Sequence, residues 1–403
     1  MKTLSESLQT YVGYDCDVLV AGGGFAGIAS ALAAARCGAK TILLEREFML
    51  GGLGTLGLIT IYLPICDGNG RQVSFGIAEE LLKLSIKYGA QDRYPKAWLE
   101  NGTLEDKKKK RFEVQYNPHI FAQLAEQLLI EAGVKILYGT SVCAVEKSGD
   151  RISEVITESK GGRCAISVKN VVDATGDADV CAMSGEDVCT NPFKNNLAGW
   201  YYGIGKDGQF LRQLGAADIP EDHMGENHIA PISNKKYDGL DAEEITDFMI
   251  NSRKKAIEDI LAKREAGDRN LEPSFVPMIP QLRMTRRVAG VLELTEEHSD
   301  TRFENSVGMV GNWRRKGPVI EVPYTCLYGE KVKNLITAGR CISASGNMWD
   351  IMRVIPVCAV TGQAAGTAAA FGVDFADVDV KKLQEKLVSD SVVLHISDLE
   401  EVK

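Results

Sequence analysis

The chain has 403 residues, of which 45% are hydrophobic, 7% aromatic and 25% charged, so it has the composition of a globular protein and exceeds the usual span of one core. Its net charge of −9 at pH 7 argues against a nucleic-acid partner, because phosphate binding needs a basic face. Residues 1–13 lack the basic start and apolar core of a signal peptide, and no apolar run is long enough to span a bilayer, so we expect a cytoplasmic protein without a membrane partner.

The predicted elements begin with a strand, a glycine turn, a helix and a second strand. The first strand covers 15–21, and the alanine-rich helix at 28–37 stops at Gly38. The second strand covers 41–44 and closes on Glu45. Two strands joined by a helix within about thirty residues make a βαβ unit, which predicts a parallel sheet with a right-handed crossover.

The turn before this helix reads GGGFAG and fits the pattern GxGxxG at Gly22, Gly24 and Gly27. One glycine permits the tight turn, a second lets the backbone approach a pyrophosphate, and a third lets helix and strand pack closely. The N–H groups at the helix start then stabilise the phosphate charge. Glu45 is placed to bond a ribose hydroxyl. These features predict a bound dinucleotide, and by themselves they fit NAD as well as FAD.

The same glycine pattern recurs at Gly203, Gly205 and Gly208. No long buried strand precedes it, and no alanine-rich helix follows it. We therefore interpret 203–208 as a loop and expect no second nucleotide domain for NAD(P)H.

Beyond the first unit the chain alternates between apolar and polar segments. In chain order the predicted elements are a glycine-rich loop at 51–57, mixed helix and polar loop at 74–111, a helix at 117–132, a strand at 134–138, a β-meander at 142–168, a helix at 242–265, a strand at 334–338 and an apolar helix at 356–370. Residues 187–324 are richer in aromatic residues, charges and prolines, which indicates a separate substrate-side region.

Several ordered motifs resemble the FAD-dependent oxidoreductases whose nucleotide fold is like those of glutathione reductase and the succinate dehydrogenase flavoprotein, in particular a largely uncharacterised bacterial subfamily. The resemblance covers nearly the whole chain. Its motifs are Gly22 to Glu45, Gly51-Gly52, Asp173 to Asp177, RMTRRVAG at 283–290 and NLITAGRCIS with RVIPVCAVTGQAAG within 334–366.

The resemblance implies FAD as the cofactor and an α/β fold. A Rossmann-like FAD-binding domain with a parallel sheet and a β-meander is expected to carry an inserted α+β substrate domain. The expected boundaries are 1–75, 112–186 and 325–375 for the FAD-binding domain, 76–111 and 187–324 for the substrate domain, and 376–403 for a C-terminal helical tail.

The resemblance also implies which residues hold FAD. The loop at 51–52 would pass the pyrophosphate, Val142 would lie against adenine, the turn at 174–177 would close over the nucleotide, and the turn at 338–340 would meet the ribityl chain. The helix that follows Arg353 would point its N-terminus at the flavin, where its dipole stabilises negative charge. The expected FAD-binding residues are Gly22, Gly24, Phe25, Ala26, Gly27, Glu45, Arg46, Gly51, Gly52, Leu53, Thr55, Val142, Ala174, Thr175, Gly176, Asp177, Gly339, Arg340, Val354, Pro356 and Val357.

Two arginines are candidate catalytic residues. Arg286 belongs to a dense cationic cluster, and Arg353 lies near the expected flavin-facing turn. Arginines there can bind a carboxylate or a polarised carbonyl of a small-molecule substrate. The alternative is that they pair with acids between the domains.

No metal site is expected, because none of the five histidines shares metal-ligand spacing with another; His223 and His228 are five apart in a polar loop. The ten cysteines contain no CxxC pair, which argues against a disulfide reductase. No histidine lies near Gly51-Gly52, so we expect FAD to be bound non-covalently.

The leading hypothesis is an FAD-dependent oxidoreductase that transfers a hydride between FAD and a small organic substrate. The substrate and the electron acceptor stay open, and the sequence is compatible with a homo-oligomer. One alternative is a protein in which FAD is structural or not redox-active, as in relatives that make a thiazole ring. Another is a dehydrogenase that uses NAD alone.

Overall fold

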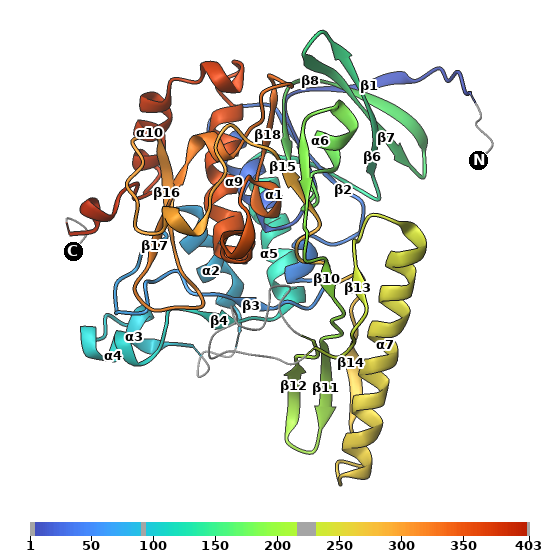
Figure 1. Cartoon of the computed structure of the whole chain (residues 1–403), viewed down its shortest axis with the longest axis vertical. Coiled ribbons are helices and arrows are strands. Elements are labelled where there is room, and N and C mark those ends of the chain that lie inside the picture. Colours follow the sequence, from blue (N-terminus) through green and yellow to red (C-terminus); the bar gives the residue numbers. More distant parts are fainter. Residues whose placement is uncertain (1–4, 90–93, 216–230, 401–403) are drawn as a thin grey trace.

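The computed structural model describes residues 5–89, 94–215 and 231–400. Within these ranges the framework is a seven-stranded sheet in the order β5-β2-β1-β8-β7-β6, with β18 paired to β8 (Figure 1). Its strands are β1 (Tyr11–Ala21), β2 (Thr41–Glu45), β5 (Lys135–Tyr138), β6 (Ser141–Ser148), β7 (Arg151–Ser159), β8 (Gly162–Asp173) and β18 (Leu335–Thr337).

The predicted βαβ unit and parallel sheet are confirmed. β1 pairs in parallel with β2 on one side and with β8 on the other, and α1 (Phe25–Arg36) connects β1 to β2. β1 begins four residues earlier than expected, because its exposed first half pairs with the first half of β8. The helix begins inside the glycine motif, since Gly24 is its N-cap in extended conformation.

The predicted β-meander is also confirmed. β6, β7 and β8 follow one another as antiparallel neighbours. β8 is long enough to take part in two arrangements: its first half pairs with β7, and Val171 to Asp173 pair in parallel with β18. The C-terminal return of the chain therefore joins the sheet one strand away from β1, with β8 between them.

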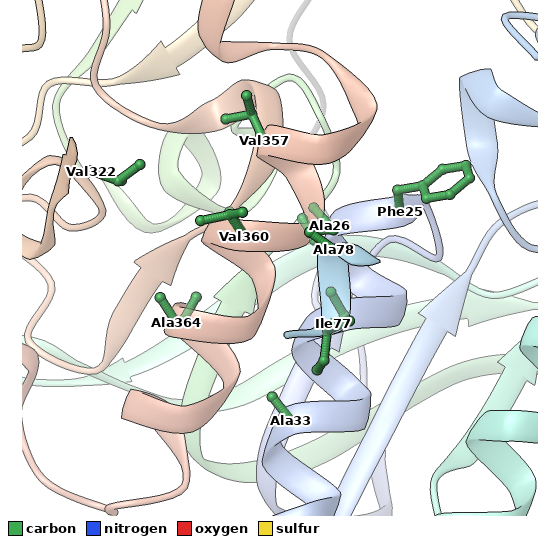
Figure 2. Packing of buried hydrophobic residues seen from close by; sticks show 14 of the residues in the cluster. Phe25, Ala26, Ala33, Ile77, Ala78, Val322, Val357, Val360 and Ala364 are labelled. Carbon is green, nitrogen blue, oxygen red and sulfur yellow. The ribbon is translucent and has the colours of Figure 1, made fainter. Parts of the chain in front are cut away.

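Helix α9 (Ile355–Ala369) lies against α1 in the middle of the molecule (Figures 1 and 2). A Cβ atom on Gly362 would lie 2.4 Å from the carbonyl oxygen of Ala26, and one on Gly366 would lie 2.1 Å from that of Ser30. The two glycines therefore serve close helix packing. Figure 2 shows how small side chains of both helices meet residues of α2 (Ile77–Ile86) in one buried cluster.

The substrate-side region contains a three-stranded antiparallel sheet of β12 (Gly208–Arg212), β11 (Tyr201–Gly205) and β14 (Glu272–Phe275). Helix α7 (Ala242–Glu265) has the predicted bounds, because the Asp241 carboxylate accepts the first backbone N–H groups as N-cap. The second glycine pattern, interpreted as a loop, is a β-hairpin in which Gly205 pairs with Gly208. It opens no helix, as expected.

The remaining elements surround this framework. They are η1 (Gly52–Gly54), β3 (Ile61–Tyr62), α3 (Lys96–Leu99), α4 (Leu104–Lys109), β4 (Val114–Gln115), α5 (Pro118–Glu131), α6 (Asp179–Ser184), β9 (Val188–Thr190), β10 (Asn195–Asn196), β13 (Lys236–Tyr237), β15 (Arg286–Val288), η4 (Glu296–His298), β16 (Ser306–Gly311), β17 (Val319–Pro323), η5 (Tyr324–Cys326), η6 (Gly339–Cys341), α8 (Gly346–Met352), η7 (Phe375–Asp377), α10 (Val380–Ser389) and η8 (Ile396–Glu400). Buried residues of α2, α5 and α10 belong to the cluster that also contains α1 and α9. The division of the chain into domains stays a prediction. No helix within the described ranges is long and apolar enough to cross a membrane.

Candidate functional site

The candidate site begins at the glycine turn between β1 and α1. Gly22 has a φ of +99°, and a Cβ atom there would lie 2.6 Å from the carbonyl oxygen of Ala174. A Cβ atom on Gly27 would lie 1.8 Å from the carbonyl oxygen of Gly22. In contrast, a Cβ atom on Gly24 would meet nothing within 4 Å. Two of the glycines are thus required by packing, whereas Gly24 faces open space.

The N-terminus of α1 starts at this open position. Gly24 is the N-cap, and no side chain among the described residues caps the N-terminus of the helix. The first turn contains no acidic residue. The first N–H groups of a helix have no partner within the helix, and they carry the positive end of its dipole. This geometry favours an anion such as a phosphate in front of Gly24.

The double-glycine loop lies directly beside the glycine turn. The N–H of Gly51 donates to the carbonyl oxygen of Gly23 at 2.8 Å, and a Cβ atom on Gly52 would lie 3.4 Å from the Cα of Gly24. The hydroxyl of Thr55 donates to the carbonyl oxygen of Leu50 at 2.6 Å and so closes the loop on itself. Residues far apart in sequence therefore border the same open space.

Glu45 links the glycine turn to the end of β2. Its Oε2 accepts the N–H of Gly23 at 2.9 Å, and its Oε1 accepts the N–H of Glu47 at 2.8 Å. Burial raises the pKa of this carboxyl, although the two N–H groups act in the opposite direction. Each carboxylate oxygen has a second lone pair, so it can also accept a hydroxyl. The N–H of Thr140 donates to the carbonyl oxygen of Glu45, which brings the start of β6, and with it Val142, to this end of the site.

The turn at 174–177 is fixed by Asp173. Its Oδ1 accepts both the N–H and the hydroxyl of Thr175, and its Oδ2 accepts the N–H of Cys181 at 3.0 Å. Gly176 has a φ of +90°, and a Cβ atom there would lie 2.3 Å from Nη2 of Arg340. The turn is therefore shaped to lie against the arginine of the C-terminal return.

The turn at 339–341 reaches the same place from the other end of the chain. The N–H of Gly339 donates to the hydroxyl of Thr361 at 2.9 Å, and a Cβ atom on Gly339 would lie 2.8 Å from the Cβ of Ala26. Arg340 pairs with Asp177 at 3.4 Å. Three turns from three parts of the chain thus surround the first turn of α1.

The family of the chain follows from comparison with known proteins. Residues 17–195 and 206–387 match the family model described as FAD dependent oxidoreductase. The chain belongs to this family. It is therefore an FAD-dependent oxidoreductase, which decides against a dehydrogenase that uses NAD alone.

Solved structures similar to the chain include a geranylgeranyl bacteriochlorophyll reductase-like protein from Thermoplasma acidophilum, at 14% identity over 94% of this chain and 84% of that one with a TM-score of 0.46. An anhydrotetracycline hydroxylase from Streptomyces rimosus matches at 12% identity over 93% and 65%, with a TM-score of 0.44. A flavocytochrome c3 fumarate reductase matches at 15% identity over 90% and 79%, with a TM-score of 0.39. Similarity at this level says nothing about the substrate of this oxidoreductase.

The residues of the site fit FAD. The open space in front of Gly24 and the uncapped start of α1 suit a pyrophosphate, and Glu45 has acceptor capacity for a ribose. Among the other expected FAD-binding residues, Arg46 is exposed and Leu53 is partly exposed, whereas the buried ones are Phe25, Ala26, Ala174, Val354, Pro356 and Val357. The ring of Phe25 stacks on that of Phe121, with the ring centroids 4.4 Å apart, and so anchors the start of α1 to α5.

A second uncapped helix start lies at α9, the helix whose N-terminus is expected from the resemblance to face the flavin. Val354 is its N-cap, with no side-chain cap among the described residues, and Pro356 occupies the first turn. Arg353, directly before it, donates to Oδ1 of Asp350 at 2.5 Å, and Arg314 donates to Oδ2 at 2.5 Å. Burial alone would raise the pKa of Asp350, but the two guanidinium groups hold it below its usual value.

Both candidate catalytic arginines are held by acids. Arg286 donates to the carbonyl oxygen of Asp177 at 2.9 Å and to Oδ1 of Asp179 at 2.8 Å. Arg353 is bound to the fully buried Asp350. The sequence cannot show the pairing of Arg286, because its partners lie more than a hundred positions away.

Two further residues organise the site without having been expected. The Sγ of Cys341 accepts the N–H groups of Gly176 and Ala178, both at 3.2 Å, and so fastens the turn at 174–177 to the turn at 339–341. The hydroxyl of Tyr116 donates to the carbonyl oxygen of Gly54 at 2.7 Å. Cys341 belongs to the motif NLITAGRCIS, but a cysteine in such a segment is normally interpreted as a small buried hydrophobic residue, so its hydrogen bonds were not predicted. Nothing in the sequence marks Tyr116.

His223 and His228 lie outside the described residues. Within the part of the chain that the structure describes, no group of three or more His, Cys, Asp or Glu side chains is arranged to hold a metal. All ten cysteines are free thiols, and most of them are buried.

Proposed function

We propose that this oxidoreductase binds FAD non-covalently and transfers a hydride between FAD and a small organic substrate. The observation that carries the proposal is the meeting of three turns around the uncapped N-terminus of α1, at a glycine with open space before it. Such an arrangement has no evident packing purpose, whereas a pyrophosphate would use every part of it.

Each part of the site then has a role. The N–H groups at the start of α1 and that of Gly52 would hold the pyrophosphate, and Glu45 would accept a ribose hydroxyl. The α9 N-terminus, directly after Arg353, would face the pyrimidine edge of the flavin, where its dipole attracts negative charge. Bound FAD would supply the hydride acceptor or donor.

Arg286 and Arg353 remain our candidates for binding the substrate. Their acids hold each guanidinium in one orientation, so little side-chain entropy would be lost when a carboxylate or carbonyl oxygen binds. A side chain that already has a partner can still donate, because a guanidinium has five N–H groups. This role predicts that substrates carry an anionic or strongly polarised oxygen.

An anaerobic reduction screen tests the function. The purified protein with FAD is mixed with organic acids, amines and sugars in the absence of oxygen, and the flavin absorbance is followed. We expect at least one oxygen-bearing substrate to bleach the flavin, as dithionite does. If dithionite bleaches it and no substrate does so, hydride transfer from such substrates is contradicted, and a structural FAD is favoured.

A further inference from the structure

A pocket of about 320 Å³ lies between the segment at 115–120 and the sheet of β11, β12 and β14, and its lining residue Tyr116 contacts the double-glycine loop. Five aromatic side chains from separate segments line it: Tyr88, Tyr94, Tyr116, Tyr202 and Phe275. Tyr88 follows α2 and Tyr116 follows β4, while Tyr202 and Phe275 belong to the neighbouring strands β11 and β14. Its volume is in the range of small-molecule sites.

The lining of this pocket differs from the rest of the protein. Of the eleven described residues that line it, five are aromatic and none is charged, whereas 7% of the chain is aromatic and 25% is charged. A larger cleft of about 490 Å³ elsewhere shows the contrast: there Arg36, Glu80 and other charged side chains form the wall and pair with one another. The described part of the wall, rich in rings and without a charge, disfavours ions and sugar acids and favours a flat apolar face.

The polar groups in the aromatic pocket are amides and hydroxyls. Gln115 uses one N–H on the hydroxyl of Tyr202, and Gln209 uses one on Ser274, so each amide keeps further donor and acceptor capacity. The start of α5 also lines the pocket, but the Asn117 side chain already accepts the N–H groups of His119 and Ile120. The helix end is therefore partly satisfied, which weakens its attraction for an anion.

One residue of the pocket wall, Tyr116, contacts the double-glycine loop. Tyr116 donates to the carbonyl oxygen of Gly54, and its ring meets Phe25 of the glycine turn edge-on. Burial raises the pKa of Tyr116 well above its usual value, so its hydroxyl remains a donor. The hydroxyl of Tyr202 is hydrogen-bonded to the hydroxyl of Thr60, which follows the double-glycine loop in the chain. A ligand that moves these rings would therefore change the hydrogen bonds that position the FAD-binding loop.

We propose that this pocket binds an uncharged, planar aromatic molecule with one or two hydrogen-bonding groups. Its ring packs against the wall to which Tyr202, Phe275 and Tyr116 contribute, and the amides of Gln115 and Gln209 orient its polar group. The site is separate from the FAD cradle and does not depend on the proposed hydride transfer.

Calorimetric titration with small probes tests the proposal. Phenol and cyclohexanol have the same size and one hydroxyl each, but only phenol is planar and aromatic. We expect indole and phenol to bind the FAD-loaded and the FAD-free protein roughly three- to tenfold more tightly than cyclohexanol. Benzoate and glucose should bind no better than cyclohexanol. Indole should also shift the visible spectrum of the FAD-loaded protein.

Two variants place the binding in this pocket. Phe275→Ala should weaken indole about tenfold and remove the spectral shift. Phe371→Ala is the matched control, because both phenylalanines are 36% exposed and Phe371 lies outside the pocket; its indole affinity should be unchanged. Indole binding that is absent, no tighter than cyclohexanol, or unchanged in Phe275→Ala overturns the proposal. Failure of FAD binding or of substrate reduction leaves the titration of the FAD-free protein unaffected and concerns the proposed function alone.

Discussion

At the scale of single residues, Gly22, Gly24 and Gly27 show that one motif uses glycine for different reasons. Gly22 and Gly27 would push a methyl group into backbone oxygens, so the fold itself requires them. Gly24 has an ordinary φ of −68° and empty surroundings, so the fold does not require it. Its glycine is explained by a ligand that comes close to the backbone.

Gly24→Ala tests this distinction. The FAD-free variant should melt at the temperature of the wild type, because the methyl group meets no protein atom. Its affinity for FAD should fall at least about tenfold, since the methyl group would stand where the pyrophosphate approaches. Thermal melts of the FAD-free protein and FAD titrations followed by fluorescence measure the two effects, with Gly161→Ala as the control on a distant surface turn. An unchanged affinity would show that the pyrophosphate does not lie in front of Gly24.

Asp350 is a residue whose importance depends on its two partners. The variant Asp350→Asn leaves Arg314 and Arg353 beside a neutral side chain in a buried place, and we expect it to lower the free energy of unfolding by about 3–5 kcal/mol at pH 7. The pKa of Asp350 is lowered from its ordinary 3.8, so its stabilisation is present above that pH and is lost as the pH falls through the folded-state pKa.

Urea unfolding measured from pH 7 downwards checks this dependence. The difference between the wild type and Asp350→Asn should stay constant to about pH 4 and narrow below it. Asp207→Asn, in the exposed hairpin turn, should differ from the wild type by less than about 0.5 kcal/mol. A difference that shrinks already between pH 7 and 5 would contradict a lowered pKa.

At the scale of elements, the close packing of α1 and α9 connects stability with the cofactor site. Gly366 approaches Ser30 in the middle of α1, whereas Gly362 approaches Ala26 in its first turn. A larger side chain at position 366 would therefore separate the helices away from the cofactor site, whereas one at position 362 would separate them at the site. We expect the two replacements to have different effects on FAD binding.

Gly366→Ala should lower the free energy of unfolding by about 1–3 kcal/mol, because its methyl group would lie 2.1 Å from a backbone oxygen. Its FAD affinity should stay within about threefold of the wild type. Gly362→Ala should lower both stability and FAD affinity, since it displaces the turn that we propose to hold the pyrophosphate. Thermal melts and FAD titrations of the pair decide this, and equal effects of both variants on FAD affinity would contradict it.

Helices and strands with characteristic local sequence patterns could be predicted from the sequence, but the residues at which they begin and end were harder to predict. Helix α7 was found with its bounds because Asp241 caps it and helix-forming residues fill it. The start of β1 was missed, because its exposed residues show no buried face and are held by pairing with β8, a strand far along the chain. The hairpin at 203–208 was missed for a different reason: its strands are short and rich in glycine.

At the scale of the whole molecule, the individual motifs could be recognised in the sequence, but their proximity in the folded chain could not be predicted. Gly24, Gly51 and Gly339 stand in separate motifs, and only the folded chain brings them around the start of α1. The acids that hold Arg286 and the thiol of Cys341 act across more than a hundred residues, so no spacing reveals them. The aromatic pocket is assembled from residues 88 to 275, which also leaves no pattern in the sequence.

The central claim is that this turn cluster holds FAD without a covalent bond, and its cofactor content tests it most directly. The purified protein is saturated with FAD, freed of excess and precipitated with acid, and the supernatant is analysed. We predict FAD in the supernatant, about one molecule per chain, and a colourless pellet. A protein that takes up no FAD, or a flavin that stays with the pellet, would contradict the account.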